Sequence, residues 1–280
     1  MEQSGIIKEI EEGLAHLPPL SPAVMKIVEL SNDLSASPRD LMNTIKLDPS
    51  LTVKILNLVN SAYFSMPQKI TSLNRALILL GFNTIKNIAL SSAFVEATGN
   101  SNSKVEPIWR HLLAVGVTSK LIAQQGGQPR QVLEEYFISG LLHDIGELML
   151  MNFVPDAFEL ALSESSEKNI SFEEACKNIM SIDGAELGVK VIDHWKLPDV
   201  FKSIVTHRMS CGEDAPHVVN AVHLADKVIR NSEIGFVADL KDLDISENDL
   251  NYNSISLEDL KKVEEDILDR IENAEVIISG

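Results

Sequence analysis

Apolar residues recur along this chain at intervals of three and four positions, which is the spacing of one face of an α-helix. Between residues 21 and 32, for example, Val24, Ile27, Val28 and Leu30 fall near a single stripe. We find no sustained alternation of apolar and polar residues bounded by hairpin turns, the pattern typical of a half-buried strand. The sequence therefore predicts an all-α protein with few strands or none.

The first hundred residues contain several residues that typically begin or end helices. Ser37-Pro38 stands where an N-cap and a first helical residue are expected, and Asp48-Pro49 repeats the arrangement. The apolar stretch 72–95 is interrupted by Gly81, which predicts two helices that meet there. In the segment NSAYF (60–64), we expect the first two residues to turn the chain and the two aromatic residues to join its two halves.

A small, polar stretch at residues 98–107 marks the boundary between two helical regions. Beyond it, residues 108–125 predict a helix ended by a Gly-Gly pair, and the next helix is expected to carry GLLHDIGELML (140–150). Periodicity predicts further helices at 155–166, 171–180, 184–195, 198–208 and 215–230. The chain thus divides into an N-terminal helical region (1–98), a second helical region (105–230) and a tail (231–280).

The tail differs in composition and charge from the rest of the chain. It holds 14 acidic and 4 basic residues, a net charge of −10 out of −17 for the whole chain. Ser256 is a plausible N-cap, and Leu260, Val263, Ile267 and Ile271 then form one apolar face of a terminal helix. Two interpretations follow: a solvated helix docked by its apolar stripe, or a segment that binds a partner.

The acidic charge narrows the classes of partner. A chain at −17 without a run of Lys or Arg repels phosphate backbones, so we expect no direct binding to nucleic acid and none to anionic membrane surfaces. No segment approaches the roughly 20 apolar residues of a membrane span, and the first residues lack the positive charge of a signal peptide. Cys176 and Cys211 share no motif and are expected to be packing residues in a reducing compartment. We therefore expect a cytoplasmic protein.

His143-Asp144 is the pair that suggests chemistry, because it lies inside an otherwise apolar stretch. Imidazole and carboxylate together suit a divalent transition metal, but a site needs further ligands from other helices. On a continuous helix, adjacent side chains diverge by about 100°, so the two could reach only an ion placed just off the axis. As a dipeptide alone, the pair indicates no more than a polar contact at a helix end.

The context resembles the HDIG motif of the HD superfamily of metal-dependent phosphohydrolases. In that superfamily the ligands come from one His, the His-Asp pair and a distant Asp. IWRHLLAVG supplies His111 and AVHLADKVIR supplies Asp226, so His111, His143, Asp144 and Asp226 each match the pattern. IVTHRMS adds His207, which matches a further histidine of two-metal relatives. The resemblance implies a divalent metal such as Fe, Mn, Zn or Ni.

Longer motifs resemble one particular family within this superfamily. LPPLSPAVMKIVELSND, IKLDPSLTVKILNLVNSAYF, ITSLNRALILLGFNTIKNIAL and HWKLPDVFKSIVTHR together resemble the HDOD family, the HD-related output domains of bacterial signalling proteins. The match runs from about Leu17 to Arg230. It implies an N-terminal helical bundle packed on an HD-like helical bundle, here followed by the C-terminal helix. It also implies a signalling output or scaffold role with signalling proteins as partners, usually without demonstrated catalysis.

Catalytic relatives of this family resemble the HD-GYP cyclic-dinucleotide phosphodiesterases. Three departures from their pattern argue against hydrolysis of phosphoesters by this chain. A histidine of those relatives corresponds to Gly184, a lysine that binds substrate phosphate corresponds to Glu147, and no GYP signature is present. Glu147 lies one helical turn beyond His143, so we expect the two side chains on nearly the same face of the helix. A carboxylate there would repel phosphate.

Two interpretations of the polar residues therefore stay open. They hold one metal ion, or Asp144 pairs with His111 or His207 in a satisfied core network, because a buried carboxylate must be paired. His223 lies three residues before Asp226, which predicts a local hydrogen bond between them.

The leading functional hypothesis is an output module that works by binding a protein or a ligand. The alternative is a metal-dependent phosphohydrolase acting on a nucleotide or cyclic dinucleotide, and a third is a metal- or ligand-sensing module. The sequence indicates neither a specific partner nor an oligomeric state.

Overall fold

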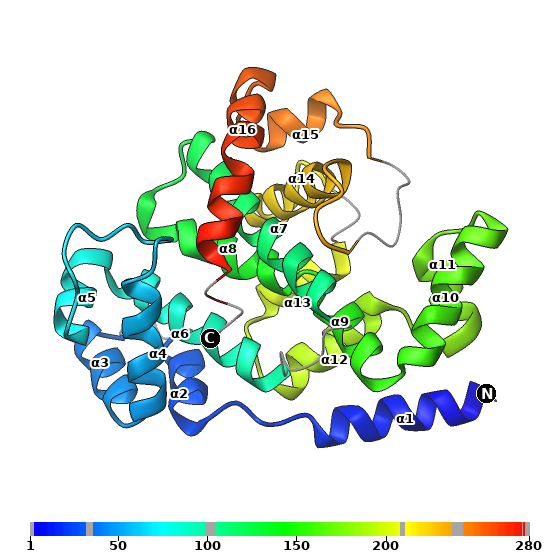
Figure 1. The fold of residues 1–280 in the computed structure, drawn as a ribbon, viewed down its shortest axis with the longest axis horizontal. Helices are drawn as coiled ribbons and strands as arrows, with labels where there is room; N and C mark the ends of the chain where they lie inside the picture. Colours follow the sequence, from blue (N-terminus) through cyan, green and yellow to red (C-terminus); the bar gives the residue numbers. More distant parts are fainter. Residues whose placement is uncertain are drawn as a thin grey trace.

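The computed structural model describes residues 3–31, 36–98, 105–207, 211–236, 243–275 and 277. Within these ranges every regular element is helical, so the all-α prediction is confirmed (Figure 1). The first part of the chain contains α1 (Gln3–His16), α2 (Pro22–Ser31), α3 (Pro38–Lys46), α4 (Pro49–Val59), α5 (Leu73–Leu80) and α6 (Phe82–Thr98). The second contains α7 (Glu106–Gln125), η1 (Arg130–Val132), α8 (Leu133–Leu142), α9 (Ile145–Phe153), α10 (Pro155–Lys168), α11 (Phe172–Met180), α12 (Gly184–His194), α13 (Asp199–His207) and α14 (His217–Asn231). The tail contains α15 (Glu247–Tyr252) and α16 (Leu257–Ala274).

The predicted helix starts are present. Ser37 accepts a hydrogen bond from the backbone N–H of Asp40, whose carboxylate accepts one from the Ser37 N–H in return. Asp48 caps α4 by accepting from the Leu51 N–H. Helices predicted between 108 and 230 end within two residues of the observed ends; residues 99–104 of the expected boundary and residue 208 lie outside the described part.

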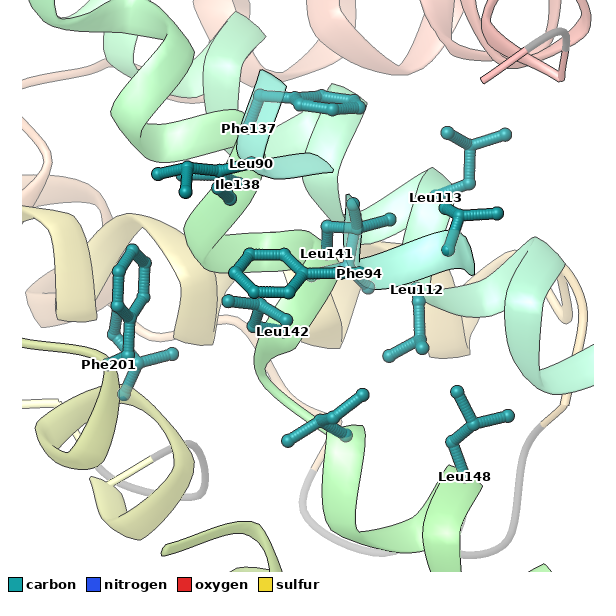
Figure 2. Packing of buried hydrophobic residues seen from close by; sticks show 14 of the residues in the cluster. Leu90, Phe94, Leu112, Leu113, Phe137, Ile138, Leu141, Leu142, Leu148 and Phe201 are labelled. Carbon is teal, nitrogen blue, oxygen red and sulfur yellow. The ribbon is translucent and has the colours of Figure 1, made fainter. Parts of the chain in front are cut away.

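Helices α2–α6 pack on one another and meet the second region where α6 lies against α8. Figure 2 shows this contact, with Phe94 and Leu90 of α6 beside Leu141, Leu142 and neighbouring residues of α8. The Phe94 ring also stacks on Trp195, with centroids 5.5 Å apart. Burying one such large apolar side chain contributes about 1.5–3 kcal/mol. The apolar core therefore runs without interruption from the first region into the second.

Helix α1 does not join the α2–α6 bundle, although it lies within the predicted N-terminal region. It packs on α9 and α11 of the second region, and Figure 1 shows it along one edge of the molecule. Its buried residues are Ile6 and Ile10. The chain then returns to α2 through residues 17–21, where the Trp195 indole N–H donates to the Pro18 carbonyl at 3.1 Å.

The tail docks through its last helix. Leu260, Val263, Ile267 and Ile271 are each 1–2% exposed, and α16 packs on α7 (Figure 1). Ser256 accepts from the Asp259 N–H as the expected N-cap. The structural prediction of a docked stripe is therefore confirmed. The short helix α15, which contacts α14, was not predicted.

No single helix in the described ranges is both long and apolar enough to cross a membrane. Two sharply bent helix pairs, residues 73–98 and 130–168, meet the length and composition criteria only when their members are taken together.

Candidate metal centre

The His143-Asp144 pair lies at a break between two helices, not within one. Helix α8 ends at Leu142 and α9 begins at Ile145, and Asp144 has φ −114° and ψ 29°, outside helical geometry. The expectation of one continuous helix through residues 140–150 was therefore wrong, and so was the argument that placed Glu147 one turn beyond His143 on a shared face. The break lets both side chains turn toward the same space.

Glycines on either side of the pair bring neighbouring helices close to it. A Cβ atom added at Gly140 would lie 2.7 Å from the Gly116 Cα of α7, so these two helices touch through backbone. A Cβ added at Gly146 would lie 1.8 Å from the Gly184 carbonyl oxygen of α12. Both approaches exclude any larger residue. They fix α7 on one side of the pair and α12 on the other.

Four predicted ligands converge in the resulting interior. His111 comes from α7, His143 and Asp144 from the helix break, and Asp226 from α14; all are 1–4% exposed. The His143 Nε2 atom lies 3.3 Å from the Asp144 Oδ2 and 3.6 Å from the Asp226 Oδ1. The His111 Nε2 atom lies 3.2 Å from the Asp226 Oδ1 and 3.9 Å from the Asp144 Oδ2. We call these four residues the HD cluster.

The HD cluster fits a metal ion by two observations. Nitrogen and oxygen ligands of a tetrahedral ion with bonds near 2.0–2.1 Å lie about 3.3 Å apart, close to the distances here. The His143 Nδ1 lies 2.7 Å from the Gly140 carbonyl oxygen, to which it donates, so loss of the second ring proton would leave the lone pair on Nε2. That Nε2 is buried, and its contacts with the Asp144 and Asp226 carboxylates at 3.3 and 3.6 Å lack hydrogen-bond geometry. One donor atom from each of His111, His143 and Asp144 lies within 4.8 Å of the other two.

The same cluster can also balance its own charge. Burial alone lowers the pKa of His143, but the Asp144 and Asp226 carboxylates outweigh burial and raise that pKa to about 10. Burial raises the pKa of Asp226, but the Arg230 guanidinium and the two imidazoles hold it well below its usual value. Two cations, protonated His143 and Arg230, then face two carboxylates. A metal ion would have to displace the His143 proton.

Arg230 is the member of this network that the motif did not indicate. Its Nε donates to the Asp226 Oδ1 at 3.0 Å, and the side chain is buried. The signal was present in the sequence, because Arg230 follows Asp226 by four residues and therefore lies on the same helical face. Arg230 and a metal ion would share one carboxylate oxygen.

His207, the fifth predicted ligand, is not brought into the cluster. Its side chain is exposed at the end of α13, and its Nδ1 lies 2.9 Å from the Ser203 carbonyl oxygen. For the network interpretation, Asp144 therefore has His111 and His143 as its imidazole neighbours. His223, expected to pair with Asp226, has its Nε2 3.6 Å from the Asp249 Oδ1.

Two of the three departures from the catalytic pattern, Gly184 and Glu147, lie next to each other. A Cβ atom at Gly184 would lie 2.7 Å from the Glu147 Cγ and 3.6 Å from its Oε1. Glu147 is 5% exposed. The space next to residue 184, where the resemblance places a further histidine, is therefore filled by the side chain that replaces the lysine. The two changes are sterically coupled.

An open cavity of about 410 Å³ lies away from the HD cluster. It is lined by parts of all three regions, including Tyr63 and Phe64, Lys120 of α7 and Arg270 of α16. The Lys120 ammonium donates to the Tyr63 hydroxyl at 2.9 Å and to the Glu134 carboxylate. Tyr63 and Phe137 have ring centroids 5.6 Å apart, so the NSAYF segment does join the two halves as expected.

Comparison with known proteins identifies the fold and the family. An uncharacterized protein of Treponema pallidum is 24% identical over 79% of this chain and 44% of its own length. YuxH of Bacillus subtilis, also uncharacterized, is 28% identical over 52% of this chain and 36% of its own length. The chain thus spans less than half the length of either curated relative.

Solved structures with low identity share the fold. An HDOD domain protein of unknown function from Geobacter sulfurreducens has a TM-score of 0.77 at 21% identity, covering 98% of both chains. A presumed phosphohydrolase of Shewanella amazonensis has a TM-score of 0.72 at 19% identity, covering 96% of this chain and 98% of its own. A presumed signal transduction protein of Marinobacter aquaeolei has a TM-score of 0.72 at 17% identity, covering 100% of this chain and 65% of its own.

The family model of the HDOD domain matches residues 17–210, more than half of the chain and including His111 and the His143-Asp144 pair. The chain therefore belongs to the HDOD family.

Proposed function

We propose that this protein is an output module of bacterial signal transduction that acts by binding a protein or a ligand and does not turn over phosphoesters. The observation that carries the proposal is the burial of all four residues of the HD cluster: His111, His143, Asp144 and Asp226 are 1–4% exposed. A metal ion hydrolyses a phosphoester only if the phosphoryl oxygens and an attacking water can both reach it. Side chains enclosed to this degree favour a structural role.

The contact between Gly184 and Glu147 supports the same proposal. A second metal of the kind held by two-metal relatives would need a ligand at residue 184, and glycine offers none. The side chain of Glu147 fills the adjacent volume. The first feature removes a ligand of a second metal ion, and the second leaves no room for one beside residue 184.

The open cavity supports binding as the mode of action. Its volume of about 410 Å³ lies within the range of small-molecule sites, and its lining combines aromatic and charged side chains. Tyr63 belongs to the first region, Lys120 to the second and Arg270 to the tail. A ligand or a partner's side chain held there would contact all three at once, which is what a module that reports an input requires.

A metal-dependent phosphohydrolase is the second candidate. The ligand spacing in the HD cluster and the position of the buried His143 Nε2 favour it. When bound, a divalent ion would be held by the four cluster residues and would supply a Lewis acid to a phosphoryl oxygen. The same ion in a closed site would instead tie α7, α14 and the helix break together.

One experiment separates the two candidates. The protein is loaded separately with Mn²⁺, Fe²⁺, Zn²⁺ and Ni²⁺, its bound metal is measured, and hydrolysis of nucleotides and cyclic dinucleotides is assayed. The double variant His143→Ala/Asp144→Ala serves as the test, His16→Ala, at an exposed site, as the matched control, and circular dichroism checks folding. We expect no hydrolysis by metal-loaded wild type. Hydrolysis that the double variant loses and His16→Ala keeps would replace the binding module with the phosphohydrolase.

A further inference from the structure

A second group of metal-ligating side chains lies outside the HD cluster, where the tail meets the second region. Cys211 precedes α14, His223 lies on α14 and Asp249 lies on α15. The Cys211 Sγ is 3.0 Å from the Asp249 Oδ1, and the His223 Nε2 is 3.6 Å from the same oxygen. One donor atom from each of the three residues lies within 4.8 Å of the other two. The sequence had indicated only a packing role for Cys211.

Asp249 is held in the orientation that a ligand needs. Its Oδ2 accepts from the Ser246 backbone N–H at 2.8 Å, from the Ser246 hydroxyl at 2.9 Å and from the Lys227 ammonium at 3.2 Å. The Oδ1 is thereby left to face Cys211 and His223. Outer hydrogen bonds of this kind orient the carboxylate ligands of metal sites. Asp249 is 1% exposed, so the arrangement is enclosed on its side.

The backbone next to Cys211 is also fixed on α14. The Gly212 N–H donates to the Asn220 Oδ1 at 3.1 Å, and the Asn220 amide donates back to the Gly212 carbonyl at 3.0 Å. Asn220 lies three residues before His223, on the same face of α14. This pair of hydrogen bonds holds the backbone next to Cys211 against α14, and the thiol sulfur lies within 4.8 Å of a His223 ring nitrogen. Two separate anchors, one at Asp249 and one beside Cys211, therefore hold the ligands together.

The ligand types and their spacing indicate zinc. Thiolate, imidazole and carboxylate together are ligands of Zn²⁺, and in a tetrahedral site such atoms lie about 3.3–3.5 Å apart. The Sγ–Oδ1 separation of 3.0 Å and the Nε2–Oδ1 separation of 3.6 Å lie on either side of that range. His223 is 6% exposed, whereas Cys211 is only partly buried, so solvent reaches the group through Cys211. A water molecule can complete the coordination there.

We propose that Cys211, His223 and Asp249 form a Zn²⁺ site that attaches α15 to α14. The ion replaces the thiol proton, and the sulfur, imidazole and carboxylate then hold one ion in common. Because each ligand comes from a different segment, binding links the tail to the second region. This site contains sulfur and the HD cluster does not, so the two can be distinguished in one sample.

Cobalt spectroscopy tests the proposal. Co²⁺ substitutes for Zn²⁺, and only a thiolate ligand gives an intense sulfur-to-cobalt absorption in the near ultraviolet. Wild-type protein titrated with Co²⁺ is expected to develop this absorption to saturation, with the intensity of one thiolate-bound ion per chain, and added Zn²⁺ should abolish it. Cys211→Ser should lose the absorption. The matched control Cys176→Ser, at a fully buried cysteine far along the chain, should keep it.

Two further measurements make the result decisive. His223→Ala and Asp249→Asn should weaken Co²⁺ binding at least tenfold while circular dichroism stays unchanged. If an Asp249 variant fails to fold, Cys211→Ser alone carries the test. A folded wild type that develops no thiolate absorption, or a Cys211→Ser variant that retains it, would overturn the proposal. Neither result bears on hydrolysis, which depends on the HD cluster.

Discussion

At the scale of single residues, Arg230 helps to neutralise the negative charge of the carboxylates in the HD cluster. Its guanidinium and a metal ion compete for Asp226, so the cluster can be closed by either cation. Leaving a buried carboxylate without a cation lowers the stability of the fold. Replacing one cation by another keeps the carboxylate neutralised. Removing Arg230 therefore distinguishes a cluster that needs metal from one that merely accepts it.

Arg230→Gln should lower the free energy of unfolding of metal-free protein by about 3–5 kcal/mol, the typical effect of breaking a buried ion pair. Added Mn²⁺ or Zn²⁺ should restore part of this loss, because binding to the native state stabilises it. Urea unfolding with and without metal measures both effects. The exposed Arg39→Gln is the control. A metal response no larger than that of wild type would show that the ion does not take the place of Arg230 beside Asp226.

Gly184 and Glu147 should behave as one steric unit. Gly184→Ala places a Cβ 2.7 Å from the Glu147 Cγ, which should cost about 1–3 kcal/mol as overpacking. In a Glu147→Ala background that atom is gone, and the cost should fall by at least about 1 kcal/mol in a double-mutant cycle. Gly188→Ala is a matched control, since its added Cβ meets Val205 at an ordinary 3.4 Å. Additive effects at 184 and 147 would contradict the contact.

At the scale of elements, α16 is anchored by side chains on one face only. Ile267 is 2% exposed, and its neighbour Leu268 is 59% exposed. Ile267→Ala should destabilise the protein by about 2–5 kcal/mol, whereas Leu268→Ala should change stability by less than about 0.5 kcal/mol. Chemical denaturation of the two variants measures the difference. Equal effects would mean that α16 does not fold together with α7.

Periodicity and capping predicted most of the helices because both signals are local. The α16 stripe and the cap at Ser37 depend on residues three and four positions apart, and the structure confirmed both. The break after Leu142 could not be predicted in this way. It lies between Gly140 and Gly146, whose close approaches to other helices involve residues far along the chain.

For the candidate site, too, the sequence predicted some features and missed others. His111, His143, Asp144 and Asp226 were named from motifs, and the structure brings all four together. His207 was named in the same manner, but its side chain lies at an exposed helix end. A motif indicates which residue types serve as ligands in a family. It does not indicate where a side chain at the end of a helix lies in one particular member.

At the scale of the whole molecule, the continuous core predicts a single unfolding transition. The core extends from the first region through α7 and α8 to α16. Trp109 lies in α7 and Trp195 follows α12, and both are 1% exposed. Tryptophan fluorescence and far-ultraviolet circular dichroism should therefore report coincident denaturation curves. Two separated transitions would mean that the regions unfold independently.

The position of α1 has a consequence for synthesis on the ribosome. Helix α1 ends at His16, and the first helix that it contacts, α9, begins at Ile145. At about 5–20 residues per second, the ribosome needs at least several seconds to translate the chain between them. During that interval the apolar face of Ile6 and Ile10 has no docking surface. The nascent chain should therefore be a chaperone client until α9 and α11 have emerged from the exit tunnel.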